Sequence, residues 1–149
     1  MITVGQLAPD FTALTDEGPV TLSALRGRKV ILYFYPKDAT PGCTIEAQGF
    51  RDIHADLTAK NAVVLGVSKD TVKKHASFRN KERLPFALVS DADGAICAAY
   101  GVWRQKKLYG KEYDGIARVT VLIDEGGVVA RVWDPVKVAG HAADVLAAL

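Results

Sequence analysis

The segment from Val30 to Cys43 constrains the fold of this chain more than any other part of the sequence. It begins with an apolar, β-branched and aromatic run, Val30–Tyr35, which is too short to span a membrane and is typical of a buried strand. Pro36 ends that run, and Pro41-Gly42 marks a turn. After the turn, apolar residues recur at helical spacing among charged ones, at Ile45, Phe50, Ile53 and Leu57. The sequence therefore places Cys43 where a buried strand leads through a turn into the start of a helix.

The position of Cys43 favours a reactive thiolate. Unpaired backbone N–H groups and the positive end of the helix dipole converge at a helix start, and both stabilise negative charge on sulfur. A lone cysteine is more often a small buried hydrophobe, but such a residue usually lies within a strand or on the apolar face of a helix. Thr40 adds a hydroxyl three residues upstream, within reach of the same substrate atom across a tight turn. Thr40 and Glu46 occupy the positions where a C-x-x-C motif would carry its second cysteine, so dithiol exchange by that route is excluded.

Several blocks of the sequence resemble one known family. The spacing Pro36-x-x-x-Thr40-x-x-Cys43 is similar to the active-site signature of the peroxiredoxins. Three further blocks resemble the bacterioferritin comigratory protein, or peroxiredoxin Q, subfamily in the same order, namely Ala8–Phe11, Pro41–Glu46 and Tyr100–Trp103. The resemblance extends from about Val4 to the C-terminal helix, and the ordered combination is much more specific than the short signature alone.

The resemblance implies a role for each of five residues. Cys43 matches the peroxidatic cysteine, which attacks the terminal oxygen of a hydroperoxide and becomes a sulfenic acid. Thr40 matches the hydroxyl that holds the peroxide oxygens, and Pro36 matches the residue that shields the pocket. Arg118 matches the distant arginine that completes the site. Glu46 matches a carboxylate that we expect in hydrogen bonds with the active-site loop and the arginine.

These roles also agree with the chemistry of the residues. Attack on a peroxide moves negative charge from sulfur to the leaving oxygen, so fixed donors near both atoms lower the barrier. Arg118 offers planar, permanently charged donors. Position alone favours a surface arginine, but Val119–Ile123 reads as a core strand, and an arginine at its entrance could point along the end of the sheet.

The second cysteine, Cys97, leaves two alternatives open. Many relatives carry a resolving cysteine five residues after the peroxidatic one, where this chain has Gln48, or in a later helix, where it has Ser77–Arg79. Cys97 itself lies in a short predicted helix rich in small residues. It is either a packing residue, in which case an external thiol must reduce the sulfenic acid, or an unusual resolver reached only after local unfolding.

Length and element order predict one α/β domain over residues 1–149. The chain is 49% hydrophobic and 24% charged, which suits one sizeable core. An N-terminal hairpin precedes strands at 30–35, 62–68, 86–89, 117–123 and 128–133 and helices near 44–59, 70–81, 93–100 and 140–148. The alternation implies βαβ crossovers, while a closing hairpin through Asp124–Gly127 makes the sheet mixed. This order is compatible with a thioredoxin-like fold, with a mixed central sheet flanked by helices.

Net charge and targeting features restrict the kinds of partner and the cellular location that we expect for this protein. The net charge of +2 is mild and the basic residues are scattered, with Arg104–Lys107 read as a solvated loop, so we expect no nucleic-acid partner. The N-terminus resembles no signal peptide and no run could span a membrane, so we expect a cytoplasmic protein. We expect a hydroperoxide substrate and an external thiol reductant, whether thioredoxin, glutaredoxin or glutathione, and a monomer or weak homodimer.

Two other interpretations involve different chemistry. The three histidines, His54, His75 and His141, show no metal-ligand spacing and are read as surface or helix-end residues, so we expect neither a metal nor a cofactor. Oxidation of Cys43 could alternatively serve a peroxide sensor or a thiol-regulated binding protein. Such a protein reacts about once per chain, whereas an enzyme turns over many peroxides.

Overall fold

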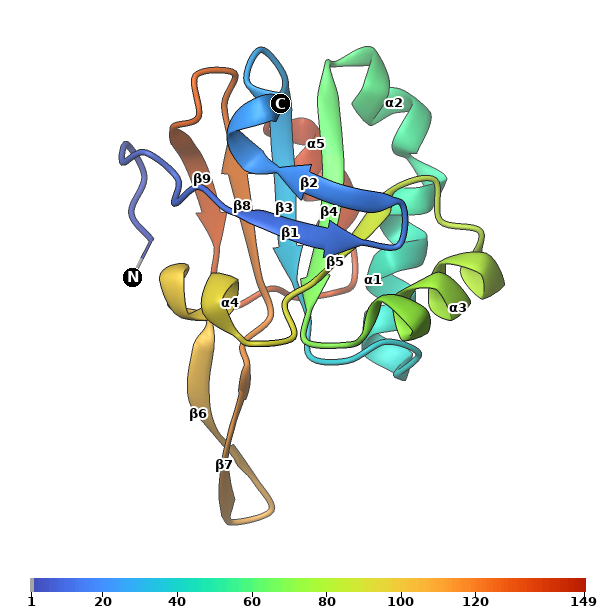
Figure 1. The fold of residues 1–149 in the computed structure, drawn as a ribbon, viewed down its shortest axis with the longest axis vertical. Helices are drawn as coiled ribbons and strands as arrows, with labels where there is room; N and C mark the ends of the chain where they lie inside the picture. The colour runs from blue at the N-terminus through green and yellow to red at the C-terminus, as the bar shows by residue number, and fades with distance from the viewer. Residues whose placement is uncertain (1) are drawn as a thin grey trace.

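A seven-stranded mixed sheet forms the centre of the computed structural model, which describes residues 2–149 (Figure 1). The strand order is β2-β1-β5-β4-β3-β8-β9. The strands are β1 (Thr12–Thr15), β2 (Gly18–Thr21), β3 (Lys29–Phe34), β4 (Ala62–Ser68), β5 (Ala87–Ser90), β8 (Val119–Ile123) and β9 (Val129–Trp133). The helices are η1 (Leu22–Leu25), α1 (Pro41–Asp52), α2 (His54–Ala59), α3 (Val72–Glu82), α4 (Ala95–Ala99) and α5 (His141–Ala147). The predicted α/β fold, with its N-terminal hairpin and mixed sheet, is confirmed.

Three parallel strands make the middle of the sheet. β3 pairs with β4, and β4 with β5, in parallel, as the βαβ crossovers require. β8 then joins β3 in the antiparallel direction, with Phe34 opposite Val119. The carboxyl ends of β3, β4 and β5 therefore meet at one edge of the sheet, and the start of β8 lies beside the end of β3. Loops at such an edge commonly carry a functional site.

Alternating residues of β3 feed two separate apolar cores. Ile31 and Tyr33, and Tyr35 directly after the strand, face the core formed with α1, α2, α3 and α5. Val30, Leu32 and Phe34 face the core formed with η1 and α4, which the β1–β2 hairpin crosses in Figure 1. Both faces of the sheet are covered, which explains why the central strands read as nearly continuous apolar runs.

The helix predicted over 44–59 is two helices. The helical dihedrals are interrupted at Ile53, where φ is −111° and ψ is 11°, so α1 ends at Asp52 and α2 begins at His54. The break lets α2 pack its buried Leu57 in the same core as β4. The apolar spacing continued across the break, which is why the sequence suggested one element.

The solvated loop predicted for Arg104–Lys107 is wrong. These residues belong to β6 (Trp103–Leu108), which pairs with β7 (Lys111–Ile116) in a hairpin that projects from the body (Figure 1). Its two-residue turn, Tyr109-Gly110, has positive φ at both positions, the backbone that suits a tight hairpin. The strands lack apolar alternation because most of their side chains are exposed, so periodicity gave no signal.

Among the helices of residues 2–149, none combines the length and the apolar character that crossing a bilayer would need.

Candidate active site

Cys43 lies in the first turn of α1, as the sequence predicted. Thr40 is the N-cap residue and Pro41 opens the helix, so the N–H groups of Gly42 and Cys43 have no acceptor within the helix. The Cys43 side chain is only 1% exposed and packs in the core with Tyr33 and Tyr35. The thiol therefore combines a helix start with a nearly water-free setting.

Arg118 connects Cys43 with Glu46. Its Nη2 donates to Cys43 Sγ at 3.4 Å, and its Nη1 donates to Glu46 Oε1 at 2.7 Å. Arg118 immediately precedes β8, whose pairing with β3 brings it beside the loop that leads to α1. Residues 75 positions apart in the sequence thus meet because β8 begins at the edge of the sheet where β3 ends.

Gly42 makes the close approach of Arg118 possible. A Cβ at position 42 would lie 3.3 Å from Arg118 Nη2, which is tighter than most side-chain contacts. The absence of a side chain there lets the guanidinium reach the sulfur. Sequence reasoning treated Gly42 only as a turn residue, and its contact with a distant strand has no local signal.

Glu46 is a buried carboxyl group in which one of the two oxygens accepts a hydrogen bond. It is 2% exposed, and within residues 2–149 its Oε2 has no hydrogen-bond partner. Burial raises the pKa of Glu46 from its ordinary 4.5 to about 7, although the positive charge of Arg118 and its hydrogen bond act in the opposite direction. Burial also acts against the charge of Arg118, but Glu46 and Cys43 outweigh it and raise the pKa of the guanidinium.

Thr40 and Pro36 lie in the loop that joins β3 to α1. The Thr40 hydroxyl donates to the Lys37 carbonyl at 2.8 Å, which leaves its oxygen able to accept a hydrogen bond. Pro36 lines a surface groove of about 350 Å³ together with Trp103 and Tyr113 of the β6–β7 hairpin.

Lys106 is a basic residue near the site that the sequence did not indicate. It extends from β6 into the same groove and donates to the Ile116 carbonyl at 3.0 Å. Partial burial and the positive charge of Arg118 lower the pKa of Lys106, while Cys43 acts in the opposite direction. Its range was read as a solvated loop, so only the hairpin pairing reveals this placement.

Cys97 lies on the other side of the sheet from Cys43. It is fully buried in the core that contains Leu32 and Phe34, and its N–H donates to Asp91 Oδ2 at 2.8 Å. Burial raises the pKa of the Cys97 thiol well above its usual range, and Asp91 adds to the effect. The structure does not bring the two cysteines together.

The expectation that the histidines are surface or helix-end residues is wrong for His75, which is buried in α3 and not at its end. His141 is the first residue of α5, which agrees with a helix-end position, but it is also buried, and its Nε2 is 2.8 Å from the Thr120 hydroxyl. His75 bonds to Asp38 and the Val89 carbonyl. The buried face of α3 carries only Phe78 as a buried apolar residue, so periodicity did not mark His75 as an interior position.

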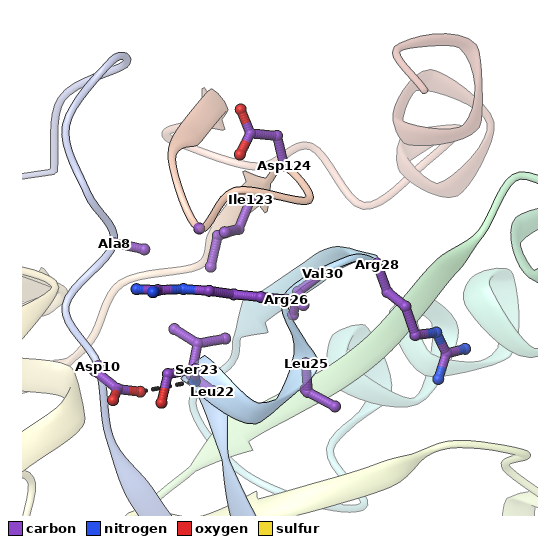
Figure 2. Close-up of a pocket in the computed structure, with 11 residues that line it drawn as sticks. Ala8, Asp10, Leu22, Ser23, Leu25, Arg26, Arg28, Val30, Ile123 and Asp124 are labelled. Atoms are coloured by element: carbon purple, nitrogen blue, oxygen red, sulfur yellow. Dashed lines mark hydrogen bonds between the residues drawn. The ribbon is translucent and has the colours of Figure 1, made fainter.

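A second hollow, shown in Figure 2, has no connection with Cys43. It lies at the amino end of β3, opposite the edge where the site is, and Val30 and Ile123 line it. The Arg26 side chain extends across it between Ile123 and Leu22 (Figure 2), and the remaining space of about 10 Å³ holds at most one water.

A thiol at a helix start, with a guanidinium as its hydrogen-bond partner and a thioredoxin-like sheet beneath it, suits the chemistry of a thiol-dependent oxidoreductase. The sequence profile of the AhpC/TSA family matches residues 4–132. The chain belongs to this family, and it is a peroxiredoxin of the Bcp, or peroxiredoxin Q, group: an enzyme that reduces hydroperoxides with electrons from thiols.

Individual relatives cover almost the whole chain. A putative peroxiredoxin Bcp of Coxiella burnetii is 57% identical over 149 residues, 99% of each protein. Peroxiredoxin Bcp of Bacillus subtilis is 47% identical, over 99% of this chain and 95% of that one. The solved structure of the Xanthomonas campestris bacterioferritin comigratory protein is 44% identical with a TM-score of 0.88, over 93% of this chain and 88% of that one.

The buried Glu46 should make stability depend on pH. A carboxyl whose pKa is raised on folding stabilises the protein most below its unfolded pKa, and that contribution is lost as the pH rises through its folded pKa, here about 7. Between pH 4.5 and 7 the loss should amount to about 3 kcal/mol. Urea unfolding is measured for two proteins that share a Cys43→Ser background, one with Glu46 and one with Glu46→Gln. The difference between their free energies of unfolding should fall by this amount. A difference that is flat with pH would contradict the assignment.

Proposed function

We propose that Cys43 is the peroxidatic nucleophile and that Arg118, Thr40, Glu46 and Pro36 complete its site. The proposal rests on one observation above all, the Arg118 guanidinium that donates to Cys43 Sγ and Glu46 Oε1 at once. Glu46 fixes the orientation of Arg118, and Thr40 accepts a hydrogen bond from the peroxide. Pro36 shields the site from the side of the groove.

The proposed step moves two electrons from sulfur to the peroxide. The Cys43 thiolate attacks the terminal oxygen, an S–O bond forms, and the O–O bond breaks. The leaving hydroxide or alkoxide takes a proton from solvent, and Cys43 becomes a sulfenic acid. Negative charge moves from sulfur to the leaving oxygen during this step, so a fixed cation within reach of both atoms lowers the barrier.

The substrates we propose are hydrogen peroxide and organic hydroperoxides. Alkyl peroxide reduction is described for the X. campestris protein. In this chain the groove beside Pro36 presents Trp103 and Tyr113, which offer apolar surface to an organic group next to the site.

The reductant we propose is an external thiol. Attack of this thiol on the Cys43 sulfenic acid releases water and leaves a mixed disulfide, which a second thiol reduces. Glutathione, a glutaredoxin or a thioredoxin could supply these thiols. Cys97 is the alternative resolver, but its burial in the opposite core supports a packing role. A single domain, a cytoplasmic location and a monomer or weak homodimer remain our predictions, as does the absence of nucleic-acid and membrane partners.

Cys43→Ser should abolish peroxide consumption, because serine at this position is a far weaker nucleophile. The measurement is loss of hydrogen peroxide with excess dithiothreitol, over many equivalents per chain. The parent should turn over repeatedly, whereas a sensor would stop near one equivalent. Substantial consumption by the Cys43→Ser variant would disprove the assignment of the nucleophile.

Thr40→Val and Arg118→Lys should each slow oxidation of Cys43 by about 10²-fold, the usual effect of losing one preorganised donor or acceptor at a reacting centre. Lysine keeps the charge but cannot bond Sγ and Oε1 with two arms. Stopped-flow fluorescence can follow the oxidation. Arg104→Lys is the matched control, because Arg104 bonds Asp134 with two arms and its hydrogen bonds go to Asp134 and the Gly101 carbonyl, not to Cys43 or Glu46, so its replacement should leave the rate unchanged. Equal rates for Arg118→Lys and the control would refute the site geometry.

Cys97→Ser should keep most of its turnover with an external thiol, because the sheet separates Cys97 from the reacting sulfur. Cys97→Ala provides a second variant that places no hydroxyl in the apolar core. Peptide mapping of the oxidised parent should show no Cys43–Cys97 disulfide. Loss of turnover in both variants, together with such a disulfide, would instead establish Cys97 as the resolver.

A further inference from the structure

A cluster of buried polar side chains lies directly beneath the loop that precedes α1. Asp38, in that loop, accepts from the Tyr35 hydroxyl at 2.5 Å through Oδ1, and its Oδ2 is 2.6 Å from His75 Nδ1. The Asp38 N–H donates to Asp70 Oδ2 at 2.9 Å, and Asp70 Oδ2 also accepts from the Ser68 hydroxyl at 2.6 Å. The loop after β3 is thus bound to α3 and to the turn that follows β4. None of these side chains belongs to the site built around Arg118.

The partners of His75 fix where its protons lie. His75 is fully buried, and its Nε2 is 3.0 Å from the Val89 carbonyl, which can only accept, so Nε2 carries a proton. A second proton must then lie between Nδ1 and Asp38 Oδ2, since two acceptors would not approach to 2.6 Å. The imidazole therefore joins Asp38 to the end of β5 with both of its nitrogens satisfied.

One residue of the same loop has a backbone conformation that is unfavourable for an amino acid with a side chain. Ala39, between Asp38 and Thr40, has a φ of 62°, in the left-handed region that an L-residue with a Cβ enters only at a cost. Thr40 follows at once as the N-cap of α1, three residues before Cys43. The hydrogen bonds of Asp38, the residue before Ala39, therefore hold the backbone that places Thr40 and Cys43.

A bound cation is not the better explanation of this cluster. The ligand atoms of Asp38, Asp70 and His75 lie within 4.8 Å of one another. However, two atoms on one metal ion are about 3 Å or more apart, because each is about 2 Å from the metal. The separation of 2.6 Å between His75 Nδ1 and Asp38 Oδ2 fits a hydrogen bond instead.

We propose that His75 and Asp38 are positioning residues for peroxide reduction, forming a buried latch that holds Ala39 in its left-handed conformation and so keeps Thr40 and the first turn of α1 in reacting geometry. The proposal rests on the function proposed for Cys43. It assigns the two residues an action through the backbone, with no contact to substrate. Misplacement of reacting groups by about 1 Å can cost about 10²-fold in rate, so a latch of this kind would be visible in kinetics.

Two substitutions at position 75 separate the latch from simple packing. The side-chain amide of asparagine reaches roughly the place of Nδ1, and that of glutamine roughly the place of Nε2. His75→Gln should therefore lose the bond to Asp38 and slow Cys43 oxidation by about 10²-fold, whereas His75→Asn should keep that bond and stay within about threefold of the parent.

Ala39→Gly supplies the decisive readout, because glycine adopts a positive φ readily. In the His75→Gln background it should restore roughly tenfold in the rate of Cys43 oxidation, while in the parent it should change the rate by less than about threefold. A residue that only fills the core would show no such dependence. The four proteins form a double-mutant cycle, with urea unfolding measured alongside to record stability.

The outcomes distinguish this proposal from the one on which it rests. If the parent does not consume peroxide, the proposed function fails. If the parent is active but the two substitutions at position 75 have equal effects, or Ala39→Gly gives the same factor in both backgrounds, the latch is refuted. Should His75→Gln not fold, Tyr35→Phe is the second variant, because it removes one donor to Asp38 and retains the ring. The latch then requires that Tyr35→Phe slow the oxidation of Cys43 and that Ala39→Gly restore part of the lost rate.

Discussion

A single cation forms hydrogen bonds with two acidic side chains at the centre of this protein. The Arg118 guanidinium donates to Cys43 Sγ and to Glu46 Oε1, and both partners are nearly inaccessible to water. In such a setting an isolated carboxylate or thiolate is costly, so each of the two depends on the same guanidinium. The position of Arg118 depends in turn on the pairing of β8 with β3, because that register brings the start of one strand to the end of the other.

The carboxyl in this arrangement has a consequence for the thiol. Burial raises the pKa of Glu46 to about 7, so Glu46 changes charge in the range where the enzyme is expected to work. When Glu46 is neutral, the guanidinium has only the sulfur to balance. When it is ionised, the cation is shared, but Glu46 then holds Arg118 in place more firmly. Ionisation of Glu46 therefore has two opposite effects on the hydrogen bond from Arg118 to the Cys43 sulfur. It reduces the positive charge left for the sulfur, and it fixes the orientation of the guanidinium.

Local features of this chain could be predicted from sequence, and features that depend on distant contacts could not. The strands around Val30–Tyr35 and the helix start at Cys43 carry their signals in neighbouring residues, and the structure has both. The strand of Arg104–Lys107 was missed because its exposed side chains show no apolar period. His75 was read as a surface residue because its burial comes from partners on a loop and a strand far away in the sequence. The contact of Gly42 with Arg118 is invisible for the same reason.

The burial of Cys43 sets opposing requirements on the loop that precedes it. At 1% exposure the sulfur is accessible to a small peroxide at most, and a bulkier thiol could reach the sulfenic acid proposed for Cys43 only after displacement of the loop or the first turn of α1. The sheet keeps Cys97 on its other face, so the chain offers no nearby thiol that would avoid this movement. The bonds of Asp38 to Tyr35, His75 and Asp70 lie where the loop would have to part from the body. These bonds must therefore be strong enough to hold the reacting geometry and weak enough to let the loop move for reduction. The left-handed conformation of Ala39 opposes the bonds and so makes this movement easier.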